Sequence, residues 1–411
     1  MRLSITRQAL SEQRIWFNSL ISLAIAGLLV ACAGSATRNP VPDTLSSQAA
    51  TIGMTGVRFW GDQSPPNLNA IIKEKFAQMR AARPQLLKAG TKAQIRFLTV
   101  SGGGSDGAFG AGLLVGWSDS GTRPEFEIVT GVSTGALIAP FAFLGKQYDP
   151  VLKEMYTTYT TSDFARKHPV RGLLGGTSLA SNKGLAGLIA KYVDQKFMAD
   201  IAAAHQTGRR LLIGTTNLDA QRPVNWDMGK IASSGNPEAL HLFRNVLLAS
   251  AAIPGVFPPV FIKVQADGKT YDEMHVDGGT TNQIFLLPNQ LMVAKDVERK
   301  TRFRPRRRVY VIRNGRVGPE HKAVQVGTLS IASRSVSTMI KYQGIGDLYK
   351  MYSFSRRNGI QYRLAYIPAN FMDTSTEPFD TVYMTKLFNL GYRLGKQGFR
   401  WQKKPPGSGG S

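Results

Sequence analysis

Two neighbouring glycine turns constrain the fold most, because each follows a predicted strand and precedes a predicted helix. Ile95–Val100 is an apolar run typical of a buried strand, and it leads directly into Gly102–Gly107. Phe126–Thr130 is a second such run, which leads into Gly131–Gly135 and a helix from Ala136. Strands that alternate with helices in this way predict an α/β fold layered around a largely parallel sheet.

The same alternation continues along the rest of the chain. Further strands are expected at Arg210–Asn217, Val224–Asp227, Tyr271–Val276, Val309–Arg313 and Tyr362–Ile367, and helices at Lys183–Val193, Pro237–Ser250 and Met384–Leu394. Upstream of the first glycine turn, Ile52–Trp60 is predicted to be a short strand and Asn67–Arg83 an amphipathic helix that docks against the main domain. Asn236 is expected to cap the helix that begins at Pro237.

The first glycine turn matches the G-x-G-x-x-G spacing of dinucleotide-binding loops, so that function has to be tested first. A dinucleotide site needs an acidic residue at the end of the second strand to hold the ribose. Glu125 and Glu127 lie instead at the start of that strand, and its end is Thr130. The position of these acids excludes the dinucleotide interpretation.

The second turn, Gly131-x-Ser133-x-Gly135, has the strand–turn–helix context of a nucleophile elbow. Such a turn holds its serine in a strained conformation that projects Oγ outward, and the flanking glycines allow strand and helix to approach closely. Ser133 is therefore the candidate nucleophile. An acyl-transfer site also needs donors for the oxyanion, each typically worth about 3–4 kcal/mol. The amides of the first turn are the candidate donors: Gly102, Gly103 and Gly104.

The residue that accepts the serine proton is harder to identify from sequence. Of five histidines only His321 follows the best acid candidate, as a Ser–acid–His order requires, and its Gly-Pro-Glu-His-Lys surroundings indicate an exposed loop. His275 could flank the site but has no obvious third partner. Asp277 ends a predicted strand and is followed by Gly278 and Gly279, although an Asp-Gly turn on its own is usually structural.

GGGxxG after one strand, GxSxG after the next and a distal DGG together resemble the patatin-like phospholipase family. Ala249–Pro259, Thr215–Asp219 and Trp226–Met228 also fit that pattern, and the resemblance extends over residues 91–395. It implies a three-layer α/β/α fold, lipid acyl hydrolase activity through a Ser133–Asp277 dyad, an oxyanion hole at the glycine cluster, and no metal or cofactor. One departure is Asp106, at a position that is often basic in the family, which leaves the phospholipid headgroup preference open.

The N-terminus has the pattern of a bacterial lipoprotein signal. Arg2, Arg7 and Arg14 precede a short apolar run that ends at Ala31, and Cys32, the only cysteine, stands where the lipobox attaches diacylglycerol. An uncleaved anchor or a simple secretory signal are the alternatives. We expect a signal peptide at 1–31, a tether and N-terminal extension at 32–90, the hydrolase domain at 91–395 and a flexible tail at 396–411. In a Gram-negative cell, Ala33 after the cysteine favours the outer membrane, facing the periplasm.

The net charge of +24 favours anionic partners, either acidic lipid or nucleic acid. No nucleic-acid-binding motif accompanies the charge, so lipid is preferred. Lys295–Arg308 carries eight basic and two acidic residues and is either a solvated loop or a contact for an anionic membrane surface. The functional alternatives are a catalytically silent lipid-binding or envelope-assembly lipoprotein, and an esterase that acts on another acyl donor.

Overall fold

A ten-stranded mixed sheet forms the centre of the molecule. The computed structural model describes residues 38–87, 93–164, 166–167, 178, 180–286, 305–375 and 377–407. The strands are β1 (Ala50–Thr51), β2 (Arg58–Trp60), β3 (Gln94–Val100), β4 (Ile128–Val132), β7 (Arg210–Asn217), β8 (Arg222–Asp227), β9 (Val260–Ala266), β10 (Lys269–Asp277), β11 (Arg306–Arg313) and β12 (Gln361–Tyr366), with a separate small pair of β5 (Arg166–Lys167) and β6 (Ala180–Ser181). The strand order of the large sheet is β1-β9-β10-β7-β4-β3-β11-β12, and in addition β8 pairs with β7 and β2 pairs with β8.

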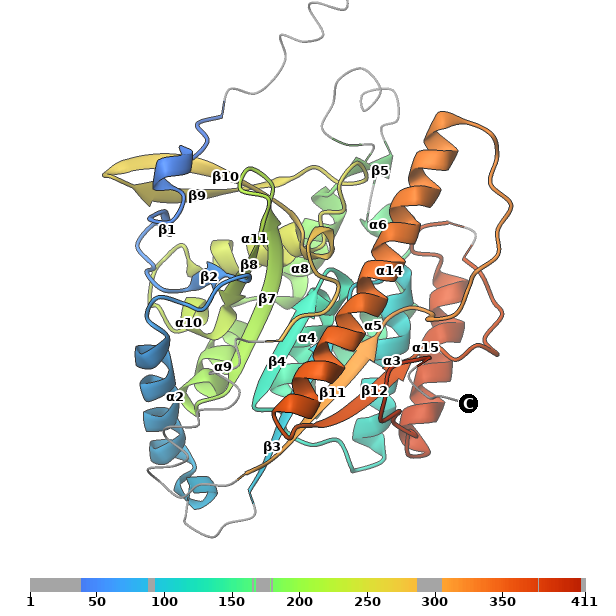
Figure 1. The fold of residues 1–411 in the computed structure, drawn as a ribbon, viewed down its shortest axis with the longest axis horizontal. Helices are drawn as coiled ribbons and strands as arrows, with labels where there is room; N and C mark the ends of the chain where they lie inside the picture. Colours follow the sequence, from blue (N-terminus) through green and yellow to red (C-terminus); the bar gives the residue numbers. More distant parts are fainter. Residues whose placement is uncertain are drawn as a thin grey trace, which may run out of the picture.

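The helices pack on both faces of this sheet (Figure 1). They are α2 (Leu68–Ala82), α3 (Gly107–Asp119), α4 (Thr134–Leu144), α5 (Asp149–Thr157), α6 (Thr161–Phe164), α8 (Lys183–Tyr192), α9 (Gln195–Gln206), α10 (Met228–Ala232), α11 (Ala239–Ser250), α14 (Thr328–Arg357) and α15 (Thr381–Lys396). The strands β7, β4, β3, β11 and β12 run parallel, and the remaining pairings of the large sheet are antiparallel. The chain thus has the expected three-layer α/β/α fold with a mostly parallel sheet.

Successive side chains of a strand point to opposite faces of the sheet, and this separates the two larger hydrophobic cores. On β3, Leu98 and Val100 join the larger core with α3, α4, α11 and α15, whereas Phe97 on the opposite face joins the core beneath α2 and α14. On β11, Tyr310 belongs to the larger core and Val311 to the core beneath α2 and α14. A sheet whose strands are buried on both faces needs near-continuous apolar runs, which is what the sequence of these strands provides.

The contact between α3 and α15 depends on small residues. A methyl group placed on Gly112 or Gly116 of α3 would lie about 2 Å from the carbonyl oxygens of Phe388 and Tyr392 on α15. A methyl group placed on Gly391 of α15 would lie 2.4 Å from the carbonyl oxygen of Phe109. Glycines four residues apart share one side of a helix, so α3 offers a strip on which the backbone of α15 lies directly.

Most strands and helices lie where the sequence predicts them, and three differences are informative. β7 has the predicted bounds, but the segment from Ile52 to Trp60 divides into a bridge and the short strand β2. The helix expected from Pro237 begins at Ala239, because the Asn236 side chain accepts a hydrogen bond from the Glu238 amide and forms a turn first. The 30-residue helix α14 was not predicted at all.

Candidate active site

Two strands end head to head on one edge of β7, and this arrangement creates the site. Parallel β4 pairs with the first half of β7 and ends with Val132 opposite Gly214. Antiparallel β10 pairs with the second half and ends with Asp277 opposite Thr215. Because β8 occupies the other edge of β7, β4 and β10 share the remaining edge. The residues that follow Val132 and precede Gly278 are therefore neighbours, although they are far apart in sequence.

Ser133 occupies the turn between β4 and α4 in a strained conformation. Its φ is 55° and its ψ is −127°, a region that residues with a side chain rarely adopt. The backbone around it is crowded, since a methyl group on Gly131 would lie 2.3 Å from the Gly135 carbonyl and one on Gly135 would lie 2.2 Å from the Val100 carbonyl. The two glycines of the predicted elbow are thus sterically required, and Ser133 has the strained geometry expected of an elbow serine.

Asp277 presents a buried carboxyl group beside Ser133. It is 5% exposed, and its Oδ1 accepts a hydrogen bond of 2.7 Å from the Gly279 amide. Its Oδ2 accepts no hydrogen bond from the described residues. Burial raises the pKa of Asp277 to about 7, while the nearby Ser133 hydroxyl and the Gly279 amide lower it. One oxygen is therefore held in place, and the other is available to receive a proton near neutral pH.

The glycines after Asp277 allow this turn to form. A methyl group on Gly278 would lie 2.4 Å from the Gly214 carbonyl of β7. One on Gly279 would lie 2.4 Å from the amide nitrogen of Gln283. The DGG sequence therefore lets the chain leave β10 against β7 while the Gly279 amide turns back toward Asp277.

The first glycine turn lies against the elbow, at the end of β3. Gly103 and Gly104 have φ values of 154° and 55°, which glycine adopts without strain. The Gly102 amide donates to the Gln283 carbonyl at 3.3 Å, whereas those of Gly103 and Gly104 make no hydrogen bond among the described residues. Of the three predicted oxyanion donors, Gly102 is therefore already engaged and the other two are available.

Three residues that the sequence did not single out hold these turns together. Ser250 accepts a hydrogen bond from the Ser133 amide at 3.0 Å and donates to the Gly214 carbonyl at 2.6 Å. At the end of β3, the Asn314 backbone amide donates to the Ser101 hydroxyl, and the Asn314 side-chain amide donates to the Ser101 carbonyl. Gln283 donates to the Gly279 carbonyl at 3.0 Å. Ser250 lies in Ala249–Pro259, which fits the family pattern, whereas Gln283 and Asn314 belong to no recognisable motif, because they act through contacts between elements distant in sequence.

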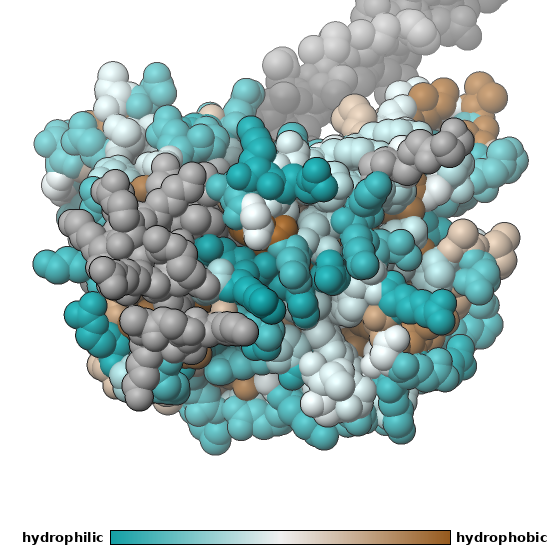
Figure 2. All heavy atoms as spheres, turned by 60° about the horizontal axis from the view of Figure 1, so that its bottom comes forward, coloured by the Kyte–Doolittle hydropathy of each residue, from teal (hydrophilic) through white to brown (hydrophobic). Residues whose placement is uncertain are grey.

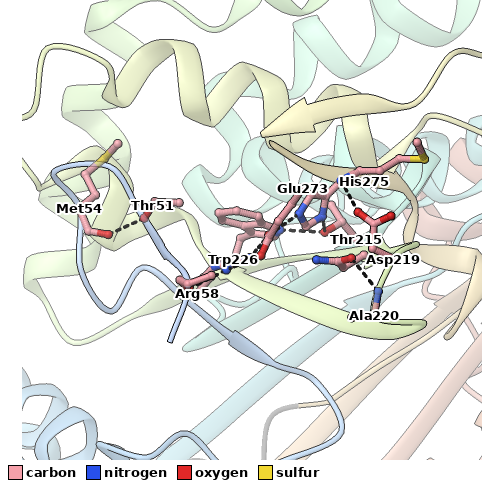
Figure 3. Close-up of polar contacts among 12 residues, drawn as sticks. Thr51, Met54, Arg58, Thr215, Asp219, Ala220, Trp226, Glu273 and His275 are labelled. Atoms are coloured by element: carbon pink, nitrogen blue, oxygen red, sulfur yellow. Dashed lines mark hydrogen bonds and ion pairs between the residues drawn. The ribbon is translucent and has the colours of Figure 1, made fainter. Parts of the chain in front are cut away.

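From His275, two residues before Asp277 on β10, a buried polar chain runs to β7 and the N-terminal extension (Figure 3). Trp226 donates to the Thr215 hydroxyl at 2.8 Å, and that hydroxyl lies 2.9 Å from His275 Nδ1. His275 Nε2 lies 3.0 Å from Glu273, which forms a two-point ion pair with Arg58. His275 thus has the partners that were not obvious from the sequence. It is fully buried, burial lowers its pKa despite Glu273, and its hydrogen bonds to Thr215 and Glu273 make it a structural side chain.

A cavity of about 590 Å³ opens over Ser133 and Asp277. The glycine turn, the loop after β11 and the N-terminal half of α14 contribute to its lining. Asp106 lies in this wall, where burial raises its pKa to about 6 although Tyr383 donates a hydrogen bond of 2.5 Å to it. The cavity is large enough for part of a lipid, and the Ser133 hydroxyl, the Asp277 carboxyl group and the glycine turn all line it.

Several predicted features lie outside this site. Cys32, the signal peptide and most of Lys295–Arg308 are outside the described residues, and His321 is exposed. Within the described part of the chain, no group of three His, Cys, Asp or Glu side chains is placed to hold a metal. In the same part, no helix is both long and apolar enough to cross a bilayer.

Comparison with known proteins finds a family match in the central part of the chain. Residues 98–288 match the family model described as patatin-like phospholipase. Among solved structures, VipD from Legionella pneumophila shares 11% identity over 75% of this chain and 67% of that one, with a TM-score of 0.32. Human GIVD cytosolic phospholipase A2 shares 11% identity over 84% of this chain and 64% of that one, with a TM-score of 0.36. No curated protein matches the chain.

Proposed function

We propose that this chain, which contains a patatin-like phospholipase domain at residues 98–288, hydrolyses carboxylic esters of membrane lipids through Ser133 and Asp277. The observation that supports this most directly is the strained Ser133 beside a buried Asp277 with one unoccupied oxygen. Backbone strain of this kind clusters at functional sites, and here it places a hydroxyl in the lining of the cavity. Phospholipids and lysophospholipids are the substrates that the family suggests.

In the proposed reaction, Ser133 Oγ attacks the ester carbonyl carbon while its proton passes to Asp277 Oδ2. The carbonyl oxygen becomes an oxyanion, which the amides of Gly103 and Gly104 stabilise, and the tetrahedral intermediate expels the alcohol with that proton. Asp277 then takes a proton from water, whose oxygen attacks the acyl-serine ester. The second intermediate collapses, returns a proton to Ser133 and releases the fatty acid.

Labelling with a fluorophosphonate probe, followed by turnover of a lipid panel, tests this proposal. We expect wild type to label and to hydrolyse lipid, Ser133→Ala to do neither, and Asp277→Asn to lose at least 100-fold in turnover, the lower range for a general base. Circular dichroism must show that both variants fold. Full activity of Asp277→Asn would exclude Asp277 as the base that accepts the Ser133 proton. A folded wild type that neither labels nor turns over any ester would favour the silent lipid-binding alternative, and turnover of non-lipid esters alone would favour the general esterase.

We further propose that the mature protein is a lipoprotein attached through Cys32 at the outer membrane. The apolar run that ends at Ala31 and the lone cysteine after it support this proposal. Metabolic labelling with a palmitate analogue should mark wild type, whereas Cys32→Ser should stay unlabelled and keep its signal peptide. Equal labelling of both forms would exclude the lipobox.

A further inference from the structure

One cation in the wall of the cavity lacks the partner that buried charges require. Arg313, the last residue of β11, lines the cavity and is 5% exposed. Its Nε makes no hydrogen bond in the described part of the chain, and its Nη1 reaches only the Gln283 side chain, at 3.5 Å. No carboxylate of the described residues lies within ion-pair distance of it. An unpaired buried charge costs several kcal/mol, so this arrangement calls for an explanation.

The other cations of the cavity are already engaged. Arg316 pairs with Glu320 at 3.1 Å and donates to two backbone carbonyls. Lys341 pairs with the same glutamate at 2.7 Å, and Arg334 donates to its carbonyl. The charges of Asp106, Asp347 and Glu320 interact with Arg313 only at longer range. It therefore differs from its neighbours in having donors that remain unused.

The surroundings of Arg313 are built to keep its guanidinium at this position. Gly344 of α14 lies against the group, and a methyl group on Gly344 would be 2.7 Å from Arg313 Cζ. Glycine inside a helix costs about 1 kcal/mol relative to alanine, so its presence suits a close packing requirement. The guanidinium thus occupies a space that a larger residue on α14 would close.

Arg313 and Ser133 are placed so that one substrate molecule can contact both residues. The Gln283 side chain lies between them: its Oε1 is 2.9 Å, and Ser133 Oγ is 3.7 Å, from the position of a methyl group on Gly102. Gln283 Oε1 is also the atom that Arg313 reaches. In a glycerophospholipid the phosphate is separated from an ester carbonyl by only a few bonds of the glycerol. An ester at Ser133 would therefore bring its own phosphate toward this side of the cavity.

We propose that Arg313 forms an anion subsite that receives a phosphate group next to the ester held at Ser133. This inference rests on the proposed hydrolase function and adds the feature of the lipid that is recognised. Guanidinium binds phosphate oxygens through charge-assisted, often paired hydrogen bonds. The phosphate belongs either to the lipid headgroup or to free inorganic phosphate, and the two sources require separate measurements.

The first measurement compares 1-acyl-lysophosphatidylglycerol with 1-monoacylglycerol of the same acyl chain. We expect Arg313→Gln to lower kcat/KM for the phosphate-bearing lipid at least tenfold, mainly through KM, and to leave monoacylglycerol turnover and fluorophosphonate labelling within about twofold. Arg313→Lys should recover part of the loss. Arg80→Gln removes the same charge from an exposed position on α2, outside the cavity lining, and should change neither substrate. An equal loss of both substrates in Arg313→Gln would overturn the subsite.

The second measurement uses inorganic phosphate alone and does not depend on turnover. Phosphate should raise the Tm of wild type and should not raise that of Arg313→Gln. Without phosphate, Arg313→Gln should be at least as stable as wild type, because it removes an unpaired buried charge. A lower Tm in the absence of phosphate, with no phosphate effect on wild type, would mean that Arg313 is only structural.

The two measurements separate the subsite from the enzyme. If wild type hydrolyses neither lipid and does not label, the proposed function fails, and the phosphate effect on Tm still tests Arg313. If wild type hydrolyses both lipids equally and Arg313→Gln does the same, the subsite fails while the hydrolase stands. A phosphate effect on Tm without any preference between lipids assigns the subsite to free phosphate rather than to the headgroup.

Discussion

At the scale of single residues, Asp277 has the properties of a base that works near neutral pH. Its carboxyl group is buried, its pKa is raised to about 7, and one oxygen is unoccupied. Only the carboxylate can accept the Ser133 proton, so we predict that kcat/KM rises with pH through about pH 7 and levels off above it. A pH profile on a neutral soluble ester measures this directly.

Asp106 provides the control for that profile, because it lies in the same cavity and burial raises its pKa to about 6. Asp106→Asn keeps a hydrogen-bond partner for Tyr383 and should leave the midpoint near pH 7. A midpoint that moves or disappears in Asp106→Asn would assign the titration to Asp106. Activity that is independent of pH between 5 and 9 in wild type would contradict a carboxylate base.

The same burial predicts a stability cost at Asp277. Its pKa rises from an ordinary 3.8 to about 7, so between these values the folded state binds more protons than the unfolded state, and stability falls as pH rises. Asp277→Asn removes this cost. The variant should be more stable than wild type by on the order of 2–4 kcal/mol at pH 8, with a difference that shrinks toward pH 4. Urea unfolding at both pH values measures it, and a variant less stable than wild type at pH 8 contradicts it.

At the scale of elements, the ion pair of Arg58 with Glu273 fastens β10 to the N-terminal extension. The side chains are 9% and 2% exposed. Burial raises the pKa of Glu273, but hydrogen bonds and charge from His275 and Arg58 outweigh it and hold the pKa at about 2. Arg58→Met would leave this carboxylate buried without its cation. We predict a loss of about 3–5 kcal/mol of unfolding free energy at pH 7, with lower turnover because β10 also carries Asp277.

Arg222→Met is the matched control, since its ion pair with Asp62 also joins the extension to the sheet but is 25% and 43% exposed. It should cost at most about 1 kcal/mol. Glu273 contributes its stability above its ordinary pKa of 4.5 and loses it as pH falls toward about 2. The difference between Arg58→Met and wild type should therefore shrink below pH 4.5. Equal effects of the two variants at pH 7 would mean that burial of the pair is irrelevant.

The contrast between local and long-range signals explains what the sequence could predict. The turn at Ser133 follows from glycines two residues away, so strand, elbow and helix could all be anticipated. Gln283 and Asn314 could not, because their contacts with Gly102 and Ser101 span about 180 or more residues and only the sheet order brings these segments together. Arg313 was predicted as a strand residue only, since burial without a partner leaves no trace in sequence.

The helix α14 was missed for a related reason. Its N-terminal half carries exposed apolar residues: Ile331, Met339 and Tyr342 are 51%, 65% and 64% exposed. Arg334, Ile340, Lys341 and Tyr342 of the same half line the cavity, so polar and apolar residues both face it. Polar and apolar residues of this half therefore do not separate into an exposed and a buried face, which is the pattern by which surface helices are recognised.

At the scale of the whole molecule, charge and exposed apolar residues favour a lipid surface as the environment of the cavity. The face in Figure 2 is mostly hydrophilic, with apolar residues in separate patches. The net charge of +24 attracts anionic surfaces. The exposed residues Ile331 and Met339, which do not line the cavity, belong to the same half of α14 that does. If this half-helix rests in the headgroup layer, the cavity opens toward its substrate.

This orientation predicts different behaviour on vesicles and on soluble esters. Turnover of vesicle lipid should increase with the fraction of anionic lipid and decrease with ionic strength, because salt screens the attraction of basic residues to the surface. Ile331→Ser combined with Met339→Ser should lower vesicle turnover severalfold and leave a soluble short-chain ester unaffected. Phe261→Ser, at a 42% exposed position on β9, is the control and should change neither. If the double variant loses both activities equally, α14 acts through the shape of the cavity, and if it loses neither, another surface meets the membrane.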